Sequence, residues 1–187
     1  MNGAFFLKIL EKGLSAVSAA LVYQALCCMI RVKKKWWCAG ILFAGCWLVS
    51  LAVIFIGDIV NGTFCLLVFL AAVWFSCEGS GLKRFTLGLM FSSTFFAFNA
   101  FYDNSVGILF NFLKLESLHN YLYVAGRAFF ALVLYLLLCQ RKAARDFELS
   151  APLWRLMLTL TCFPTGILLS LILLRSPFGE KGTVIAD

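Results

Sequence analysis

The sequence predicts an all-α membrane protein, a polytopic bundle of six transmembrane helices with a short interfacial helix between the fourth and fifth. Composition is the first reason: of 187 residues, 63% are hydrophobic and 13% charged, and the mean hydropathy is +0.95. A soluble domain cannot hide so much apolar surface, because roughly half of any folded surface stays in water. The apolar residues also form long runs, and basic residues gather at the ends of alternate runs.

A spanning helix needs about 20 mostly apolar residues. The segments that qualify are residues 14–30, 36–56, 59–76, 85–101, 118–139 and 153–174. Together they predict a single transmembrane domain over residues 1–187, with no soluble domain. The first run is expected to be retained rather than cleaved as a signal peptide, because basic residues follow it where a small-residue cleavage site is needed.

Basic residues predict the orientation of the bundle. They lie in the loops after the first, third and fifth helices, as Arg31, Lys33, Lys34, Lys35, Lys83, Arg84, Arg141, Lys142 and Arg145. The opposite side carries acids, including Asp58, Asp103 and Glu116. The positive-inside rule therefore makes the basic loops cytoplasmic and leaves both termini outside. The net charge of +7 then reflects topology and headgroup anchoring rather than nucleic-acid binding.

The stretch FSCEGSGLKRF, residues 75–85, is expected to be one of these cytoplasmic turns. Gly79 and Gly81 permit the positive φ angles of a tight turn. Lys83 and Arg84 are expected to anchor the start of the fourth helix at anionic headgroups.

The segment NSVGILFNFLKLES, residues 104–117, differs from the spans. Asn104, Gly107, Asn111 and Lys114 recur at steps of three and four, which places one polar stripe along a helix. The segment is too short to span, so we expect it to lie flat at the outer interface.

Pro164 falls inside the sixth span, in LTCFPTGILL. It removes one backbone hydrogen bond and is expected to kink the helix, with Thr161 and Thr165 available to bond the freed carbonyls. The kink is either a static bend or a hinge for signalling.

Five polar residues toward the outer side are candidate ligand-binding residues: Arg127, Asn99, Asp103, His119 and Asp58. Arg127 lies about two turns inside the fifth span. It can bind a ligand carboxylate, pair with Asp103 or Glu116, or extend to the outer headgroups. Asn99 shares a helical face with Ser92 and either joins helices together or lines a wet outward-facing pocket.

No enzyme active site, metal site or cofactor is expected. The chain lacks Walker, dinucleotide-binding, HExxH and CxxC motifs. Its eight cysteines lie mostly in apolar runs and are interpreted as small buried hydrophobes, with disulfides or metal binding as the alternative. A catalytic pair of Cys65 with the single histidine, His119, is the remaining enzymatic possibility.

Several motifs together resemble one family. They are RVKKKWW at residues 31–37, FSCEGSGLKRF, the polar fourth helix with Asn99, and ELSAPLW at residues 148–154. This order resembles the N-terminal transmembrane sensor region of GHKL-type, AgrC-like bacterial sensor histidine kinases. The resemblance implies a receptor in the bacterial plasma membrane that detects an extracellular small molecule or peptide, as in quorum sensing, and relays it by helix repacking. It also implies a homodimer.

The same resemblance implies parts that this sequence does not contain. A GHKL kinase needs a phosphoacceptor histidine and ATP-binding boxes on the cytoplasmic side, and these 187 residues have neither. We therefore expect a fragment or truncated relative, not an enzyme, that reaches a cytoplasmic response regulator only through a missing kinase domain. The alternative is the six-helix substrate-binding subunit of an energy-coupling-factor vitamin transporter, with SAVSAA at residues 15–20 as a small-residue docking motif. A membrane peptidase is a third, weaker hypothesis.

Overall fold

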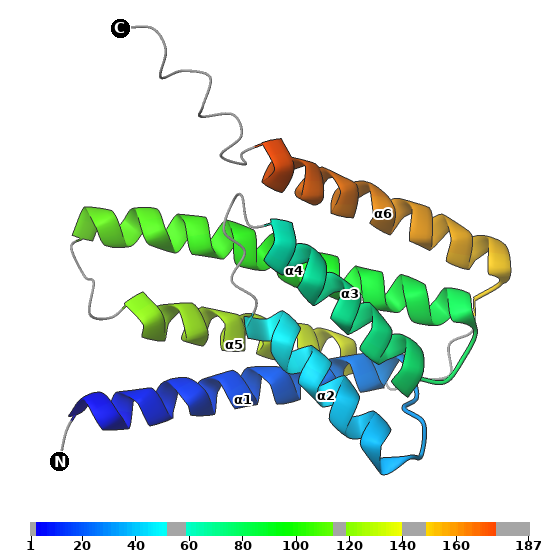
Figure 1. Cartoon of the computed structure of the whole chain (residues 1–187), viewed down its shortest axis with the longest axis horizontal. Coiled ribbons are helices and arrows are strands. Elements are labelled where there is room, and N and C mark those ends of the chain that lie inside the picture. The colour runs from blue at the N-terminus through cyan, green and yellow to red at the C-terminus, as the bar shows by residue number, and fades with distance from the viewer. Residues whose placement is uncertain (1–2, 52–58, 114–118, 140–148, 175–187) are drawn as a thin grey trace, which may run out of the picture.

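The computed structural model is a set of helices packed side by side (Figure 1). It describes residues 3–51, 59–113, 119–139 and 149–174. The helices are α1 (Gly3–Met29), α2 (Trp36–Leu51), α3 (Ile59–Ser76), α4 (Gly81–Leu113), α5 (His119–Cys139) and α6 (Ala151–Leu174). The predicted all-helical class is therefore confirmed for the described part of the chain.

Three of these helices are long and apolar enough to cross a membrane. The stretches concerned are Lys8–Met29 in α1, Gly81–Asp103 in α4 and Tyr121–Cys139 in α5. Shorter apolar stretches occur at Trp36–Ser50 in α2 and Asn61–Ser76 in α3. The 23 residues of Gly81–Asp103 extend about 35 Å as a helix, against about 30 Å for a hydrocarbon core. The chain therefore has the helical character of a membrane protein.

The long helices form the spine of the fold. α1 packs along α5 and α2, while α4 packs against α3, α5 and α6. In Figure 1, the left-hand ends of α1, α4 and α5 extend together beyond the shorter α2 and α3. Side chains from all six helices meet in one buried core, which includes Leu26, Leu42, Phe69, Phe95, Ala131 and Trp154.

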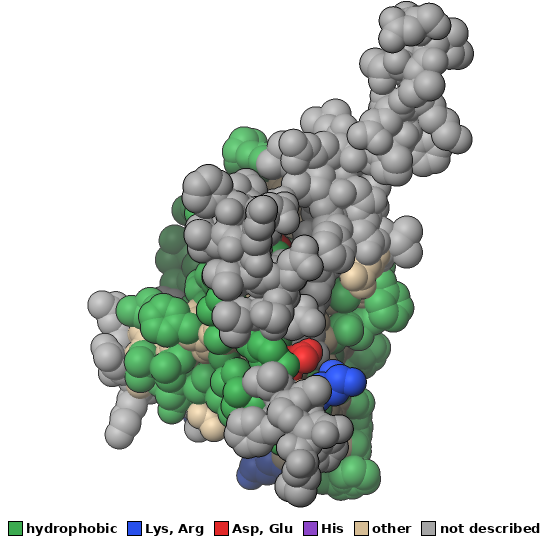
Figure 2. All heavy atoms as spheres, turned by 90° about the vertical axis from the view of Figure 1, so that its left-hand side faces the viewer, with side chains coloured by type: hydrophobic (Ala, Val, Ile, Leu, Met, Phe, Trp, Pro, Cys, Tyr) green, Lys and Arg blue, Asp and Glu red, His purple; other side chains and the backbone are tan. Residues whose placement is uncertain are grey.

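The outer surface is also apolar. Figure 2 shows hydrophobic side chains covering most of the described surface on one face. Large apolar side chains on the outer faces of α3, α5 and α6 are exposed, including Phe64 (59%), Leu67 (60%), Phe129 (67%) and Phe163 (73%). A soluble monomer rarely exposes such extended apolar faces, whereas lipid chains solvate them without penalty.

The end of α4 differs from the prediction. A break was expected at residues 102–104, followed by a separate interfacial helix over residues 104–117. In the structure α4 runs without interruption for 33 residues to Leu113. The described part of that segment, including Asn104, Gly107 and Asn111, is thus the end of α4, and Lys114 lies outside the described residues. No glycine or proline interrupts residues 101–105, and polar side chains there contact α5, so polarity did not mark a helix end.

One end of the bundle, which we call the basic end, comprises residues 30–35, residues 77–80 and Cys139. Val32 and Cys77 form an antiparallel bridge. Within it, the backbone N–H of Lys33 donates to the carbonyl of Ser76 (2.9 Å), and that of Glu78 donates to the carbonyl of Arg31 (2.8 Å). A disulfide joins Cys28 of α1 to Cys139 of α5. The loops after α1 and α3 and the end of α5 therefore share one end, as alternating helix directions require.

Of the two glycines predicted to have positive φ angles at this turn, only Gly79 has one. Gly79 has a φ angle of 107°, which L side chains rarely adopt. Gly81 instead begins α4, and a Cβ atom there would lie 3.0 Å from the Trp74 ring. Gly81 is therefore needed for close packing rather than for a positive φ.

The basic side chains at and next to the basic end differ in their surroundings. Lys33 Nζ donates to the carbonyl of Phe75, and Arg84 Nη1 to that of Trp74, both at 2.7 Å. These bonds satisfy carbonyls in the last turn of α3, where positive charge is favourable. Lys83 is 4% exposed, so it lies inside the bundle rather than reaching toward headgroups. The exposed basic residues are Arg31, Lys34 and Lys35, while Arg141, Lys142 and Arg145 lie outside the described residues.

Pro164 does not interrupt α6, which continues around it from Ala151 to Leu174. The hydroxyl of Thr165 donates to the carbonyl of Thr161 (2.7 Å), one turn below. Thr161 donates in the same way to the carbonyl of Met157 (2.7 Å). Pro164 leaves the carbonyl of Leu160 without its helical N–H donor, and these two hydroxyls bond other carbonyls, so the expectation that they satisfy the freed carbonyl is not met. The hinge role stays a prediction.

Candidate functional site

A buried ion pair joins α4 to α5. Nη2 of Arg127 donates to both carboxylate oxygens of Asp103, at 2.9 Å to Oδ1 and 2.7 Å to Oδ2. Their side chains are only 6% and 7% exposed. Burying either charge alone would be costly, so the two residues stabilise each other as a unit. Of the alternatives that the sequence left open for Arg127, the structure shows pairing with Asp103.

Two tyrosines connect the same helices beside the ion pair. The hydroxyl of Tyr123 on α5 donates to the backbone carbonyl of Asp103 (2.8 Å). The hydroxyl of Tyr102 on α4 donates to the carbonyl of Leu122 (2.6 Å). The guanidinium of Arg127 also lies over the Tyr123 ring, 5.9 Å from its centroid. Each helix thus contributes one tyrosine hydroxyl to the backbone of the other.

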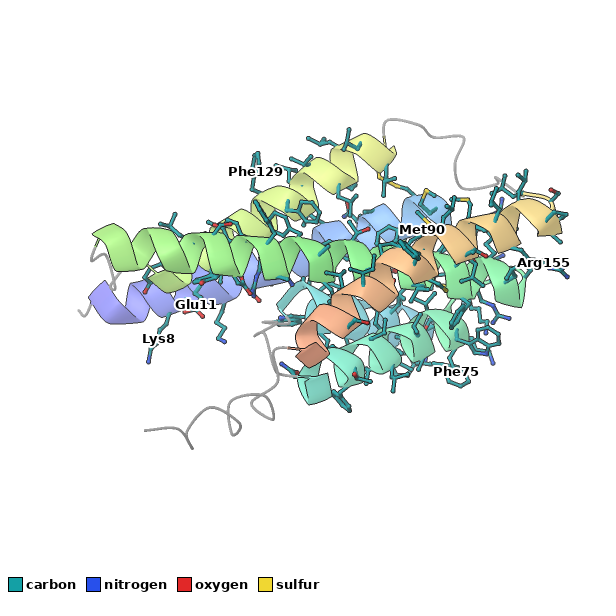
Figure 3. The ribbon with its side chains drawn as sticks, turned by 90° about the horizontal axis from the view of Figure 1, so that it is seen from above. Lys8, Glu11, Phe75, Met90, Phe129 and Arg155 are labelled. Atoms are coloured by element: carbon teal, nitrogen blue, oxygen red, sulfur yellow. A yellow bond between two sulfur atoms is a disulfide. The ribbon has the colours of Figure 1, made fainter. Side chains whose placement is uncertain are left out.

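Aromatic rings of α4 and α5 stack on one another next to the two tyrosines. Phe98 stacks on Phe130, with centroids 3.9 Å apart, and on Tyr102 at 5.3 Å. Gly126 allows the Tyr102 ring to lie close to the backbone of α5, because a Cβ atom at this position would overlap the ring. Figure 3 shows Phe129, the neighbour of Phe130, pointing away from the bundle. The inner face of α5 therefore supplies the site and its outer face supplies apolar surface.

The ion pair lies far from the basic end. Gly81–Asp103 has 23 residues, or about 35 Å of helix, which is slightly more than the thickness of a hydrocarbon core. Thus, if the basic end lies at one membrane interface, Asp103 lies near the other. The arrangement places positive charge at one end of α4 and a neutralised ion pair toward the other.

The structure places the other predicted site residues separately. Asn99 is fully buried one turn before Asp103, on the same face of α4. It therefore lies in the bundle interior rather than in the wall of an open pocket. His119 begins α5, and its side chain is outside the described atoms. Asp58 lies outside the described residues.

The hydroxyls of the fourth helix bond mainly within that helix. Ser92 donates to the carbonyls of Gly88 (2.9 Å) and Leu89 (3.1 Å), and Ser93 donates to the carbonyl of Leu89. These bonds therefore do not support the expectation that the two serines join α4 to neighbouring helices. Their hydroxyl groups find acceptors locally, which makes them tolerable in a buried helix.

The sequence interpretation missed the aromatic frame around the ion pair. Its residues are Phe98, Tyr102, Tyr123, Gly126 and Phe130. A usable signal was present, since three pairs in this region share the spacing of four that aligns side chains on one helical face. These pairs are Phe98 with Tyr102, Asn99 with Asp103, and Tyr123 with Arg127.

The cysteines agree only in part with the interpretation as buried hydrophobes. Cys38, Cys46, Cys65 and Cys77 are buried. Burial raises the pKa of the Cys77 thiol to about 12, an effect that nearby Cys27 reinforces and that Arg84 and Lys33 oppose. Cys28 and Cys139 instead form the disulfide that the sequence left as an alternative. Among the residues that the structure describes, no three His, Cys, Asp or Glu side chains are grouped to hold a metal ion.

No protein-family model, curated protein or solved structure matches the chain. The geometry and charge of the site therefore carry the functional inference, because fold alone does not determine function.

Proposed function

We propose that the chain is a multi-pass sensor or receptor domain of the bacterial plasma membrane, with the basic end in the cytoplasm. All six helices are proposed to span, with both termini outside, because the exposed Arg31, Lys34 and Lys35 at the basic end suit the cytoplasmic face. α2 and α3 have 16 and 18 residues and extend about 24 and 27 Å, so local thinning of the bilayer would accommodate them.

The buried ion pair between Arg127 and Asp103 is the observation that carries this proposal. It joins two long apolar helices near the end that the topology places outside. Charged side chains that are buried between apolar helices are uncommon and often functional. A ligand carboxylate that replaced Asp103 at the guanidinium would remove the ion pair between α4 and α5.

Such an exchange would shift the bundle between two packings. A ligand can do this only if it binds one packing more tightly than the other. The aromatic frame favours two discrete states, because the stack of Phe98 on Phe130 is either intact or broken rather than gradually deformed. The signal would reach a response regulator through a histidine kinase domain that these 187 residues do not contain.

The transporter hypothesis is weaker because its docking motif is already occupied. Ser15, Ser18 and Ala19 are buried at 3%, 2% and 0% exposure. Nε1 of Trp47 on α2 donates to the hydroxyl of Ser15 (3.1 Å). The small residues of α1 thus pack within the chain instead of presenting a surface to a coupling subunit.

Synthetic peptides with free or amidated C-termini test the sensor proposal on the purified protein in detergent. We expect some peptides with a free carboxylate to raise the melting temperature of the wild type, and their amidated forms to have no effect. Arg127→Met should abolish the response, whereas Arg155→Met, a change at an exposed arginine on α6, should preserve it. An equal response of the Arg127→Met variant, or none from the wild type across the panel, would rule out carboxylate exchange at this site.

A further inference from the structure

The disulfide at the basic end joins the ends of two helices. Cys28 lies in the last turn of α1 and Cys139 is the last residue of α5, two helices that pack along each other (Figure 3). Both cysteines are half-buried. The bond therefore fixes the ends of two long helices and remains partly open to reagents.

This end is the one that the basic loops assign to the cytoplasm. Thiols there are kept reduced, and the disulfides that do occur are usually transient or redox-sensing. A bond at this location is therefore expected to form and break with conditions, unlike the permanent disulfides of secreted domains. The compartment depends on the proposed topology, whereas the exchange chemistry does not.

We propose that Cys28 and Cys139 form a reversible thiol–disulfide latch between α1 and α5, which exchanges with cellular dithiols and small-molecule disulfides. In reduction, a thiolate of the dithiol attacks one sulfur of the pair and forms a mixed disulfide. The other cysteine leaves as a thiolate and takes up a proton. The second thiol of the dithiol then attacks the mixed disulfide and releases the first cysteine. Two electrons and two protons pass to the pair, and the dithiol leaves as a disulfide.

The other cysteines at this end are poorly placed for exchange. Cys38, Cys46 and Cys77 are fully buried at 0% exposure. Exchange requires an accessible thiolate, and the pKa of the Cys77 thiol, raised to about 12, keeps that group protonated at neutral pH. Cys27 is half-buried, but it is turned about 100° from Cys28 around α1. A switch of Cys139 to Cys27 would therefore require α1 to rotate.

The latch has a structural consequence for the ion-pair site. α5 is fixed to α1 by the disulfide at its C-terminal end and to α4 by Arg127 in its N-terminal half. Reduction releases the first of these two attachments. The redox state of the pair therefore sets how freely α5 can move when the ion pair is perturbed.

Counting free thiols tests the latch directly. The purified chain is equilibrated in detergent, without denaturant, in mixtures of reduced and oxidised dithiothreitol, whose mixed disulfides with single thiols are resolved by ring closure. It is then quenched with acid, unfolded and labelled with a maleimide polymer that adds mass at each thiol. We expect six labels under oxidising and eight under reducing conditions, because the chain has eight cysteines and the disulfide takes up two of them.

Matched variants separate the pair from its neighbours. Cys28→Ser and Cys139→Ser should each take seven labels at every redox setting, since seven cysteines remain of eight and no partner is left. Cys162→Ser, at an exposed free cysteine on α6, should still lose two labels on oxidation. Eight labels for the wild type under all conditions would show that no bond forms. Six labels even in excess dithiothreitol would show a permanent bond, and either result overturns the latch.

The same count in cells separates this inference from the proposed topology. A pulse of a membrane-permeant thiol oxidant should change the acid-quenched wild type from eight labels to six and leave Cys28→Ser unchanged. A constant count during the pulse would overturn the latch in the cell. If an impermeant reductant breaks the bond from outside, the latch stands and the cytoplasmic assignment of this end is wrong.

Discussion

Replacing Arg127 by methionine should cost more stability than any other single arginine change in the described helices. The substitution removes the guanidinium and its two hydrogen bonds to Asp103 but preserves much of the side-chain volume. The Asp103 carboxylate is then left buried, with its side chain 7% exposed. The Tyr123 hydroxyl cannot compensate, because it donates to the backbone carbonyl of Asp103 rather than to the carboxylate.

The expected cost is about 3–5 kcal/mol, the range for removing one partner of a buried ion pair. Replacing both residues, as Arg127→Met with Asp103→Leu, removes both charges and should return the protein to within about 1.5 kcal/mol of the wild type. Asp103→Leu alone leaves the Arg127 guanidinium buried and should cost a similar amount, so the coupling energy of this double-mutant cycle should exceed the cost of either single change.

Unfolding of the purified proteins by sodium dodecyl sulfate in mixed micelles, followed by far-ultraviolet circular dichroism, measures these free energies. Arg155→Met is the control, because Arg155 is exposed on α6 and its loss should change stability by less than about 0.5 kcal/mol. The reasoning fails if Arg127→Met is as stable as this control. It also fails if the double variant is destabilised by the sum of the two single changes.

Three further substitutions test the packing of the turn, the α4–α5 contact and the basic end. Gly79→Ala should lose about 1–3 kcal/mol in the same unfolding assay, because its φ of 107° suits only glycine. Gly40→Ala should instead gain about 0.5–1 kcal/mol, because Gly40 lies on an exposed part of α2 with open space where a Cβ atom would lie. Gly126→Ala should lose about 1–3 kcal/mol, since the Tyr102 ring is held by its hydroxyl and cannot move away freely; a gain like that of Gly40→Ala would contradict this packing. The Cys77 thiol ionises near pH 9 when unfolded and near 12 when folded, so its contribution to stability is present below pH 9 and lost as the pH rises toward 12. Stability curves should therefore fall less steeply over that range in Cys77→Ala than in the wild type, and identical slopes would argue against the shift.

Much of the helical architecture follows from local features of the sequence. Long apolar runs predict helices wherever lipid is the solvent, since backbone groups must be satisfied within each segment. The end of α4 could not be placed in this way. Residues 102–104 are polar enough to suggest a membrane interface. The side chain of Asp103 is instead paired with Arg127 on α5, so α4 continues through these residues.

The candidate site was likewise predictable from the sequence only in part. Arg127 and Asp103 stand out in the sequence because buried charges are uncommon in apolar runs. Their pairing does not, because 24 residues separate them and the sequence also allowed Glu116, a ligand or the headgroups as partners of Arg127. The disulfide is even harder to predict. Cys28 and Cys139 are separated by 111 residues, and the sequence alone does not reveal which of the eight cysteines are paired.

Labelling of engineered cysteines on intact cells tests the proposed topology most directly. Lys34→Cys lies at the basic end and Ser105→Cys lies just beyond the ion pair on α4, and both native side chains are exposed. Each variant is compared with the wild type, using a membrane-impermeant maleimide before and after permeabilisation. We expect Ser105→Cys to be labelled on intact cells and Lys34→Cys only after permeabilisation. The reverse pattern would contradict the sensor topology and place the Arg127–Asp103 pair on the cytoplasmic side.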